Sequence, residues 1–271
     1  MDDSVSTGIV FTDVDGTFVG SDHHAIMECA PVVRRIATRV PLCLVSARSP
    51  EGLYPIQRDL GFVGPLACYS GAYVLDEKGV ELFSCTMTFD VAMRVKGVVN
   101  ATFESLTVGM YGFHDWIVDD VNDERIQHEQ RLVQTTAREC ADLVSVFGAR
   151  GVHKLLVMGE PSQIMEAESI LQDEFPMLNV VRSSSTLCEI MSKEVNKGHA
   201  VRLLCEHYGL SASQAIAFGD GPNDIDMLNA VGRSYAMANA EESVKQAATQ
   251  VLPWSNVECG VARALEAMNL A

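Results

Sequence analysis

A short apolar stretch that ends abruptly in two aspartates is the most constraining feature of this chain. Residues 8–17 read GIVFTDVDGT, in which Val10 and Phe11 favour a strand and the glycine near the end provides a sharp break. The carboxyl ends of strands are where open α/β sheets bind ligands. Two carboxylates at such a place, Asp13 and Asp15, are costly to bury unless a cation neutralises them. The segment therefore predicts a buried strand that delivers two acids to a binding site.

The two outer parts of the chain alternate between strand and helix patterns. Apolar residues recur at helical spacing in residues 24–39, 50–60, 197–209, 238–249 and 260–270. Short apolar runs typical of strands occupy residues 40–46, 65–84, 186–192 and 215–221. Strands that alternate with helices predict an α/β fold with a doubly wound, mainly parallel sheet.

A long central stretch has a different pattern. Amphipathic helices are expected at residues 89–106, 123–144 and 162–175, and strands at 106–112, 116–120, 153–159 and 178–183. Connections without secondary structure rarely exceed ~15 residues, so this stretch is not a loop. We expect residues 85–183 to form an inserted α+β domain. The first domain is then built from residues 1–84 and 184–271.

The charge of the chain excludes several kinds of partner. A formal net charge of -16 argues against nucleic acid and anionic membrane surfaces, because binding to phosphate backbones needs surplus Lys and Arg. A small phosphorylated molecule is compatible with this charge, since a bound divalent cation reverses the sign of the charge locally. No apolar run approaches the ~20 residues that span a bilayer. No pattern in the sequence indicates an oligomeric state.

The cysteines and the first residues predict a compartment. Eight cysteines are scattered without any Cys-x-x-Cys pair, and several, such as Cys43 and Cys68, lie in apolar strand-like runs. Buried reduced thiols behave there as small hydrophobic side chains. The opening MDDSVSTG is acidic and lacks the order of charge and apolarity that a signal peptide has. We therefore expect reduced cysteines and a cytoplasmic protein.

Two further polar positions lie at predicted element ends. Ser46 ends the apolar run VPLCLVS and is followed two residues later by Arg48. Lys197 opens a predicted helix, where a cation opposes the helix dipole and so often has an anionic partner. Lys193, four residues earlier, is the rival for that role. A serine after a strand is by itself more often a turn or a helix cap.

The string GDGPND follows the apolar run AIAF and is the most specific of the later signals. It places Asp220, Asn223 and Asp224 directly after a predicted strand. Together with Asp13 and Asp15, Asp220 gives an oxygen-only ligand set that suits Mg²⁺. A zinc site would use histidine or cysteine, and none of the seven histidines stands in these motifs.

In this order, the motifs resemble those of the haloacid dehalogenase-like (HAD) phosphohydrolases. The resemblance covers residues 8–84 and 184–271, and the insertion lies between the motif that contains Ser46 and the one that contains Lys197. The strings SGAYVLDEKG and GDGPNDIDML, with an insertion of this kind, are similar to the Cof-type phosphatases of that family. The resemblance implies a Rossmann-like core with an α/β cap domain at 85–183. In those phosphatases the residues that most commonly follow the hydroxyl residue equivalent to Ser46 are Gly-Arg, whereas this chain has Ala47-Arg48.

The resemblance also implies an activity and roles for the residues. The expected reaction is Mg²⁺-dependent hydrolysis of phosphomonoesters of small metabolites, sugar phosphates in particular, through an aspartyl-phosphate on Asp13. Asp15 would act as general acid and base, and Asp224 would support the site. Phosphate would be held by Ser46, Arg48, Lys197 and Asn223, and the metal by Asp13, Asp15 and Asp220.

Three alternatives stay open. A phosphomannomutase-like phosphotransferase uses the same core, although the GDGPND string disfavours it. A mannosyl-3-phosphoglycerate-type phosphatase shares that string but more often has a lysine-containing turn where this chain reads SARS. A degenerate HAD module that only binds ligands would have lost at least one of Asp13, Asp15, Lys197 or Asp220, and all four are present.

Overall fold

The structure, a computed structural model, describes residues 7–270 and divides into two compact units. The core unit contains the chain up to Arg48, Gly52–Phe83 and the chain from Asn196 onward. The inserted unit contains Ser49–Glu51 and Ser84–Val195. Each unit has its own sheet, and each is described by itself.

The core unit is built on an eight-stranded sheet in which β1 (Ile9–Asp13) is central. β1 pairs in parallel with β2 (Leu42–Val45) on one side and β12 (Ala215–Gly219) on the other. The full order is β14-β13-β12-β1-β2-β3-β4-β5. The outer strands are β3 (Leu66–Cys68), β4 (Tyr73–Leu75), β5 (Glu81–Ser84), β13 (Arg233–Ala236) and β14 (Gln250–Val251).

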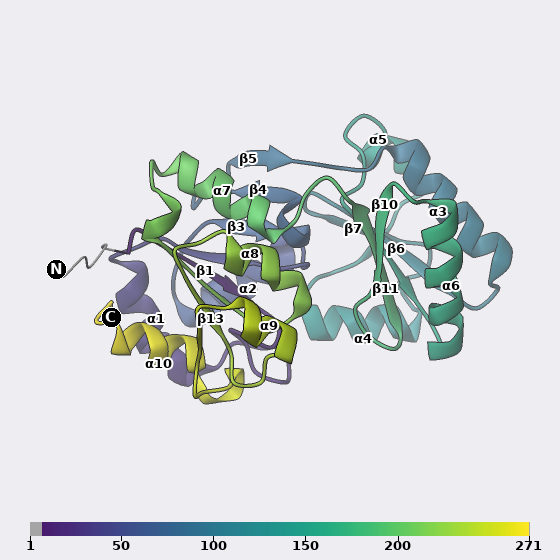
Figure 1. The fold of residues 1–271 in the computed structure, drawn as a ribbon. Helices are drawn as coiled ribbons and strands as arrows, with labels where there is room; N and C mark the ends of the chain where they lie inside the picture. Colours follow the sequence, from purple (N-terminus) through teal and green to yellow (C-terminus); the bar gives the residue numbers. More distant parts are fainter. Residues whose placement is uncertain (1–6, 271) are drawn as a thin grey trace. The chain divides into compact units, whose positions relative to one another are not determined.

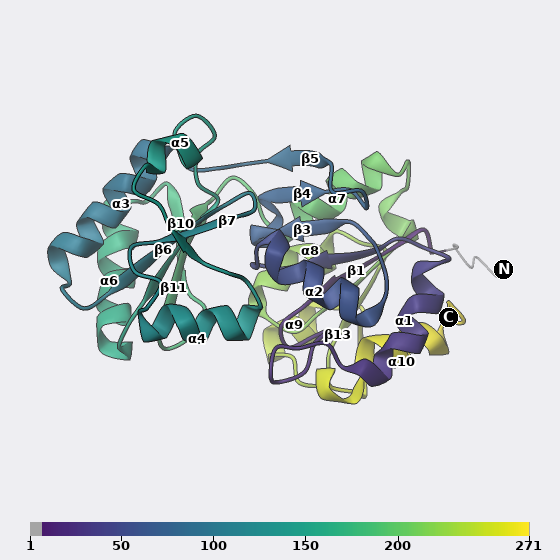
Figure 2. The same ribbon diagram turned by 180° about the vertical axis from the view of Figure 1, so that it is seen from behind.

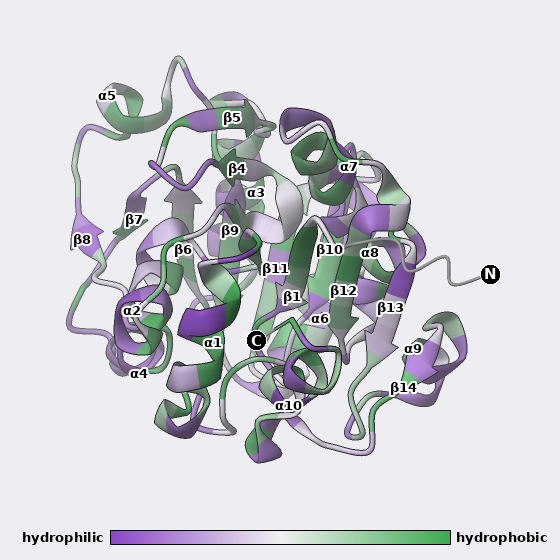
Figure 3. Cartoon of the chain, turned by 90° about the vertical axis from the view of Figure 1, so that its left-hand side faces the viewer, coloured by the Kyte–Doolittle hydropathy of each residue, from purple (hydrophilic) through white to green (hydrophobic). Residues whose placement is uncertain are grey.

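The hydrophobic colour of β1 and β12 in Figure 3 reflects their burial on both faces, as a central parallel strand requires. Because β1, β2 and β12 are parallel, their carboxyl ends meet at one edge of the sheet. The expected α/β class is confirmed.

Helices cover both faces of this sheet (Figures 1 and 2). One face carries α1 (Ala30–Ala37), α2 (Pro50–Leu60) and α10 (Gly260–Ala267). The other carries α7 (Lys197–His207), α8 (Ile225–Asn229) and α9 (Glu242–Ala247). Single 3-10 turns are η1 (Met27–Cys29), η2 (Tyr69–Gly71), η3 (Ala212–Gln214), η4 (Pro222–Asp224) and η5 (Asn256–Glu258). Within residues 7–270, no helix has the length and apolar character needed to cross a bilayer.

The inserted unit has a six-stranded sheet in the order β10-β11-β9-β6-β7-β8. Its strands are β6 (Thr107–Gly112), β7 (Asp115–Val118), β8 (Arg138–Glu139), β9 (Lys154–Met158), β10 (Leu178–Arg182) and β11 (Leu187–Ser192). Its helices are α3 (Phe89–Thr102), α4 (Glu124–Val133), α5 (Leu143–Phe147) and α6 (Pro161–Glu174).

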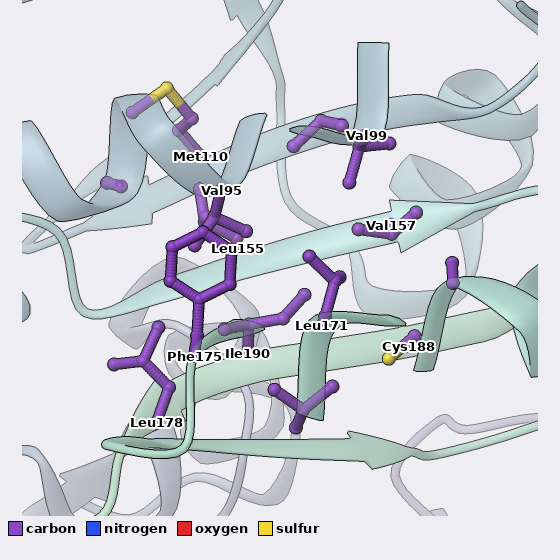
Figure 4. Packing of buried hydrophobic residues seen from close by; sticks show 14 of the residues in the cluster. Val95, Val99, Met110, Leu155, Val157, Leu171, Phe175, Leu178, Cys188 and Ile190 are labelled. Atoms are coloured by element: carbon purple, nitrogen blue, oxygen red, sulfur yellow. The ribbon is translucent and has the colours of Figure 1, made fainter. Parts of the chain in front are cut away.

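The core of the inserted unit lies between two helices and its sheet. Val95 and Val99 of α3 and Leu171 of α6 meet Leu155 and Val157 of β9 there, all nearly or fully buried (Figure 4). Apolar side chains of one stripe on each helix are thus removed from water against one face of the sheet. This cluster is separate from the core unit's sheet and gives the insertion a hydrophobic core of its own.

The inserted unit ends later than we expected. The strand at 186–192, which we expected to belong to the core domain, is β11, and it pairs with β9 and β10 in the inserted sheet. The unit therefore extends to Val195 rather than to residue 183. The sequence of an apolar strand does not indicate which of two sheets the strand joins, because a strand buried in either sheet has the same apolar pattern.

Two other expectations about the elements differ from the structure. The helix expected at 123–144 is broken after α4, where Gln134 has a left-handed φ of 52° and β8 and α5 follow. The helix expected at 24–39 is limited to η1 and α1. The spacing of apolar residues does not reveal such breaks. A single residue with left-handed φ and ψ ends a helix without changing that spacing.

Two cysteines depart from the expectation of reduced thiols. Cys29 and Cys259 form a disulfide with a Cα–Cα distance of 5.9 Å, although 230 residues separate them in sequence. They directly precede α1 and α10, which pack on each other (Figure 2). The spacing of cysteines in the sequence could not predict this disulfide, because it depends on the packing of two helices that are far apart in the chain. The other six cysteines are free thiols, as expected.

His153 is a fully buried histidine of the inserted unit. Its Nδ1 accepts the backbone N–H of Phe113 at 3.1 Å, so Nε2 carries the hydrogen that it donates to Ser84 Oγ, also at 3.1 Å. Burial, together with the nearby charge of Arg150, lowers the pKa of His153 from 6.5 to about 3. The folded protein therefore resists protonation of this ring.

We expect His153 to make the inserted unit sensitive to acid. Below the ordinary pKa of histidine, the unfolded chain binds a proton that the folded chain does not, so the free energy of unfolding falls by about 1.4 kcal/mol per pH unit. This loss begins near pH 6.5 and continues toward pH 3, the folded-state pKa. His153→Gln keeps one donor and one acceptor but cannot titrate. Between about pH 7.5 and about pH 5.5, urea unfolding should show about 1 kcal/mol less loss of stability in the variant. Identical losses in both proteins would contradict the prediction.

Candidate active site

A buried ion cluster joins the end of β1 to the start of α7. Asp13, the last residue of β1, is 6% exposed, and Lys197, the first residue of α7, is 1% exposed. The ammonium of Lys197 donates to Asp13 Oδ1 at 2.5 Å and to Asp224 Oδ1 at 2.6 Å. Lys193 lies elsewhere, since its Nζ donates to the backbone oxygen of Pro176. Of the two lysines that we considered, only Lys197 meets the acids.

Asp224 organises the turn that follows β12. Its Oδ2 accepts the backbone N–H groups of Asp220 at 2.9 Å and Gly221 at 3.0 Å, while its Oδ1 accepts from Lys197. Both of its oxygens therefore have protein partners. Completely buried, this carboxylate ties the turn to the lysine and sets the position of Asp220.

Asp220 lies next to the loop after β1. Its Oδ1 accepts a hydrogen bond from Thr17 Oγ1 at 2.6 Å. Gly16 has φ +83°, and a Cβ on it would collide with the Asp220 carboxylate. This close approach explains why Gly and Thr follow the two aspartates in the sequence. Carboxylate oxygens of Asp13, Asp220 and Asp224 lie within 4.8 Å of one another.

The cluster carries more negative than positive charge. Three carboxylates share one ammonium, so full ionisation leaves two negative charges in excess. Burial, and then the charge of Asp224, raise the pKa of Asp13, against the opposing effect of Lys197. Burial also raises the pKa of Asp220. The pKa of Lys197 is raised as well, because Asp13 and Asp224 outweigh its burial.

The donor set fits a hard divalent cation. Asp13 and Asp220 supply oxygen atoms only, and the excess negative charge is the kind that a cation relieves. With such an ion bound, both carboxylates would stay ionised at neutral pH. The observations suit Mg²⁺ and give no histidine or thiol ligand that would favour zinc among the described residues.

Asp15 lies outside this carboxylate cluster, and its side chain contacts Arg48 and His23. Arg48 Nε and Nη2 donate to its two oxygens at 2.9 and 2.5 Å, and His23 Nδ1 lies 2.7 Å from Oδ1. Burial alone would raise the pKa of Asp15, but the hydrogen bonds from His23 and Arg48 hold it well below its usual range.

These contacts assign Arg48 a partner that we did not expect. We expected Arg48 to bind phosphate, and in the structure its guanidinium contacts Asp15. Sequence reasoning missed His23, because a histidine eight residues after Asp15 belongs to none of the motifs. The only local signal is the dipeptide His-His at 23–24, which has no fixed meaning.

The two remaining candidates for phosphate binding lie at the ends of β2 and β12. Ser46 is 2% exposed, and its Oγ accepts the backbone N–H of Arg48 at 3.2 Å, which leaves its O–H available to donate. Asn223 is exposed on η4, and its Oδ1 lies close to Gly221. Both sit on strand ends at the same edge of the sheet as Asp13.

Comparison with known proteins decides the family. The family model described as haloacid dehalogenase-like hydrolase matches residues 10–265. The chain belongs to the haloacid dehalogenase-like hydrolases. The α/β core, the inserted unit and the order of the motifs agree with the resemblance seen in the sequence, down to the Cof-type subfamily.

Individual relatives of this HAD hydrolase are phosphatases by name. A Haemophilus influenzae protein named "Putative phosphatase" is 33% identical over 258 residues, covering 95% of this chain and 96% of that protein. The "HMP-PP phosphatase" of Serratia proteamaculans is 26% identical, covering 88% and 86% of the two chains. A solved haloacid dehalogenase-like hydrolase from Bacteroides thetaiotaomicron has a TM-score of 0.87 at 25% identity, covering 97% and 100%. This HAD hydrolase is a phosphatase enzyme.

Proposed function

We propose that the protein is a Mg²⁺-dependent phosphatase that hydrolyses phosphomonoesters of small metabolites, sugar phosphates above all, through an aspartyl-phosphate. The observation that carries the proposal is the buried contact of Asp13 with Lys197 beside Asp220 and Asp224. A nucleophilic carboxylate needs a cationic partner to approach a phosphate dianion, and this cluster supplies the partner and a cation site together.

In the first step, a carboxylate oxygen of Asp13 attacks phosphorus. The new O–P bond forms while the bond from phosphorus to the leaving oxygen breaks in line with it. Lys197 stays charged because both of its partners are acids, and it stabilises the negative charge of the transferring group. The hydroxyl of Ser46 and the amide of Asn223 are the other donors for the phosphoryl oxygens.

Proton transfer falls to Asp15. Because the contacts with His23 and Arg48 favour its ionised form, Asp15 takes up a proton from solvent before the first step and then gives it to the leaving oxygen. The resulting carboxylate takes a proton from the water that hydrolyses the aspartyl-phosphate. Hydrolysis returns Asp13 to its free form and releases inorganic phosphate, so atoms and charge balance over the two steps. No redox partner or second substrate is needed.

The metal has its own set of ligands in this proposal. Asp13, Asp220 and the backbone carbonyl of Asp15 would hold Mg²⁺, with Asp224 fixing the turn behind Asp220. The ion would supply charge neutralisation between the nucleophile and the phosphate.

The class of substrate follows from charge and from the names of relatives. The net charge of -16 disfavours polyanionic nucleic acid as the phosphate donor. Relatives named for HMP-PP and phosphoglycolate act, by those names, on small phosphorylated molecules. The inserted unit, as a cap domain, would contact the leaving group and exclude water. The location we propose remains the cytoplasm, where such metabolites are found.

A substrate panel tests the proposal. We expect inorganic phosphate to be released from hexose and pentose phosphates in the presence of Mg²⁺, without any bisphosphate activator. The Asp13→Asn protein, purified identically, is the blank for contaminating phosphatases. Activity that requires a sugar bisphosphate and yields an isomeric sugar phosphate would favour the phosphomannomutase-like alternative. Release of phosphate from non-sugar esters alone would overturn the sugar-phosphate assignment, and selectivity for mannosyl-3-phosphoglycerate would favour that narrower alternative.

A further inference from the structure

The disulfide between Cys29 and Cys259 joins the starts of α1 and α10, which pack on each other in the core unit (Figure 2). Cys29 is buried, whereas Cys259 is half-buried and so within reach of a small reagent. In the cytoplasm, the compartment that we propose, disulfides are rare, and those that form are mostly transient and catalytic or redox-sensing. A disulfide in this place therefore calls for a function.

The backbone at Cys259 is one that cysteine does not adopt readily. Its φ of 57° lies in the left-handed region, which favours glycine and asparagine. Cys259 directly follows η5 and precedes Gly260, the first residue of α10. A sulfur is thus present at a position where the backbone alone would favour another residue, which indicates that the sulfur itself has a role.

The η5 turn binds the loop that follows β1, residues 14–26. Asn256, the first residue of η5, donates from Nδ2 to the backbone oxygen of Val19 at 2.8 Å. Its backbone N–H donates to Oδ1 of Asn239 at 3.1 Å, and Nδ2 of Asn239 donates to the backbone oxygen of Gly16 at 2.8 Å. The two asparagines therefore hold loop 14–26 at two points.

Loop 14–26 connects the candidate active site to the disulfide. Within it, Thr17 donates to the carboxylate of Asp220. A backbone bridge between Val19 and Ala25 closes the loop, and Cys29 follows four residues later. The disulfide thus ties the end of this loop to the turn that binds its middle.

We propose that Cys29 and Cys259 form a redox switch that orders loop 14–26. In the oxidised protein the bond holds η1 and η5 together, so Asn256 stays on Val19. In the reduced protein the two turns are free to separate, and the loop loses order. The effect on catalysis rests on the proposed phosphatase function, whereas the effect on the loop does not.

A small-molecule disulfide such as oxidised glutathione supplies the oxidant by thiol–disulfide exchange. The thiolate of Cys259 attacks one sulfur of oxidised glutathione, whose S–S bond breaks and releases one glutathione thiolate. The thiolate of Cys29 then attacks the Cys259 sulfur of the mixed disulfide and releases the second. Two electrons and two protons pass from the two cysteines to two molecules of glutathione. Dithiothreitol, which is itself oxidised to a disulfide, reverses the reaction.

Hydrogen exchange with mass spectrometry tests the switch without any turnover. Wild-type protein is equilibrated with oxidised glutathione or with dithiothreitol, and peptide mapping without reductant should show the cross-link only in the first sample. We expect amides of residues 14–26 to exchange more slowly in the oxidised protein, while those of β6 in the inserted unit exchange equally in both. The thermal unfolding midpoint should be about 5 °C or more higher after oxidation.

Two variants and a control separate the switch from general effects of the reagents. Cys29→Ala removes the disulfide, so its loop 14–26 should exchange as in the reduced wild type under both conditions. Asn256→Ala keeps the disulfide but removes the contact with Val19, so its loop should exchange fast even when oxidised. Cys140→Ala, at a half-buried free thiol of the inserted unit, should respond as the wild type does.

Phosphate release gives the second readout. Reduction of the wild type should lower kcat/KM about fivefold and oxidised glutathione should restore it, whereas Cys29→Ala should stay at the reduced level throughout. Failure of the cross-link to form, or equal exchange of residues 14–26 in both states, would overturn the switch. Activity that is unchanged or higher after reduction would overturn its effect on catalysis. Slower exchange after oxidation in a protein without phosphatase activity would support the switch and refute the proposed function.

Discussion

Asp13→Asn should abolish turnover, with kcat reduced by about 10³-fold or more, because the amide cannot attack phosphorus or form the covalent intermediate. The fold should survive. The introduced amide keeps an oxygen for the ammonium of Lys197, and the cluster loses one of its three negative charges, a buried one. In the absence of metal, the thermal unfolding midpoint should therefore equal or exceed that of the wild type, since removal of a repelled buried charge is stabilising.

The measurement combines steady-state phosphate release with acid-quenched mass spectrometry of the protein. The wild type should show one added phosphoryl group on the peptide that contains Asp13, and the variant should show none. Asp173→Asn, an equivalent change at an exposed position of α6, is the control for the substitution itself. Activity within a factor of about ten of the wild type in Asp13→Asn would rule out covalent catalysis by this residue.

Removal of divalent cations should have an effect of comparable size. We expect EDTA to eliminate phosphate release and added Mg²⁺ to restore it, because the uncompensated charge of Asp13 and Asp220 repels a phosphate dianion. Ca²⁺ should not restore it, since its larger and looser coordination does not hold the nucleophile in line. Restoration by Zn²⁺ alone would argue for another ligand set.

Metal binding can be followed without any turnover. Mg²⁺ should raise the thermal unfolding midpoint of the wild type, because a ligand that binds only the folded state stabilises it. In Asp220→Asn this rise should shrink and a higher Mg²⁺ concentration should be needed for half-maximal activity. The matched control is Asp226→Asn, at an exposed aspartate whose Oδ2 accepts a hydrogen bond from Asn196. A thermal unfolding midpoint of the wild type that does not change when Mg²⁺ is added would contradict a metal site at Asp13 and Asp220.

The parts of the site that the sequence predicted depend on polar residues at the ends of predicted strands or at the start of a predicted helix. Asp13 ends β1 and Asp220 directly follows β12, and because these strands are parallel neighbours, the two side chains converge at one edge of the sheet. Lys197 could be found because it opens a helix where a cation needs an anionic partner, and it does meet Asp13. In each case a local pattern and a general rule of α/β sheets suffice.

The parts that escaped prediction depend on contacts between segments that carry no pattern. Arg48 has the same residue type whether it binds phosphate or Asp15, and only the path of the chain around His23 decides. β11 reads as a buried strand in either sheet. The link between Cys29 and Cys259 requires that α1 and α10 pack together, which no spacing encodes.

The central place of β1 in its sheet has a consequence for synthesis on the ribosome. β1 is complete early, but its neighbour β12 begins only at Ala215, after the whole inserted unit has been made. Until then Asp13 lacks Lys197 and the turn at Asp220. The inserted unit, apart from Ser49–Glu51, is one continuous segment and can fold as soon as it emerges, since domains generally fold as units during translation. If the proposed function holds, the nascent chain stays inactive until β12 and the turn at Asp220 have been translated.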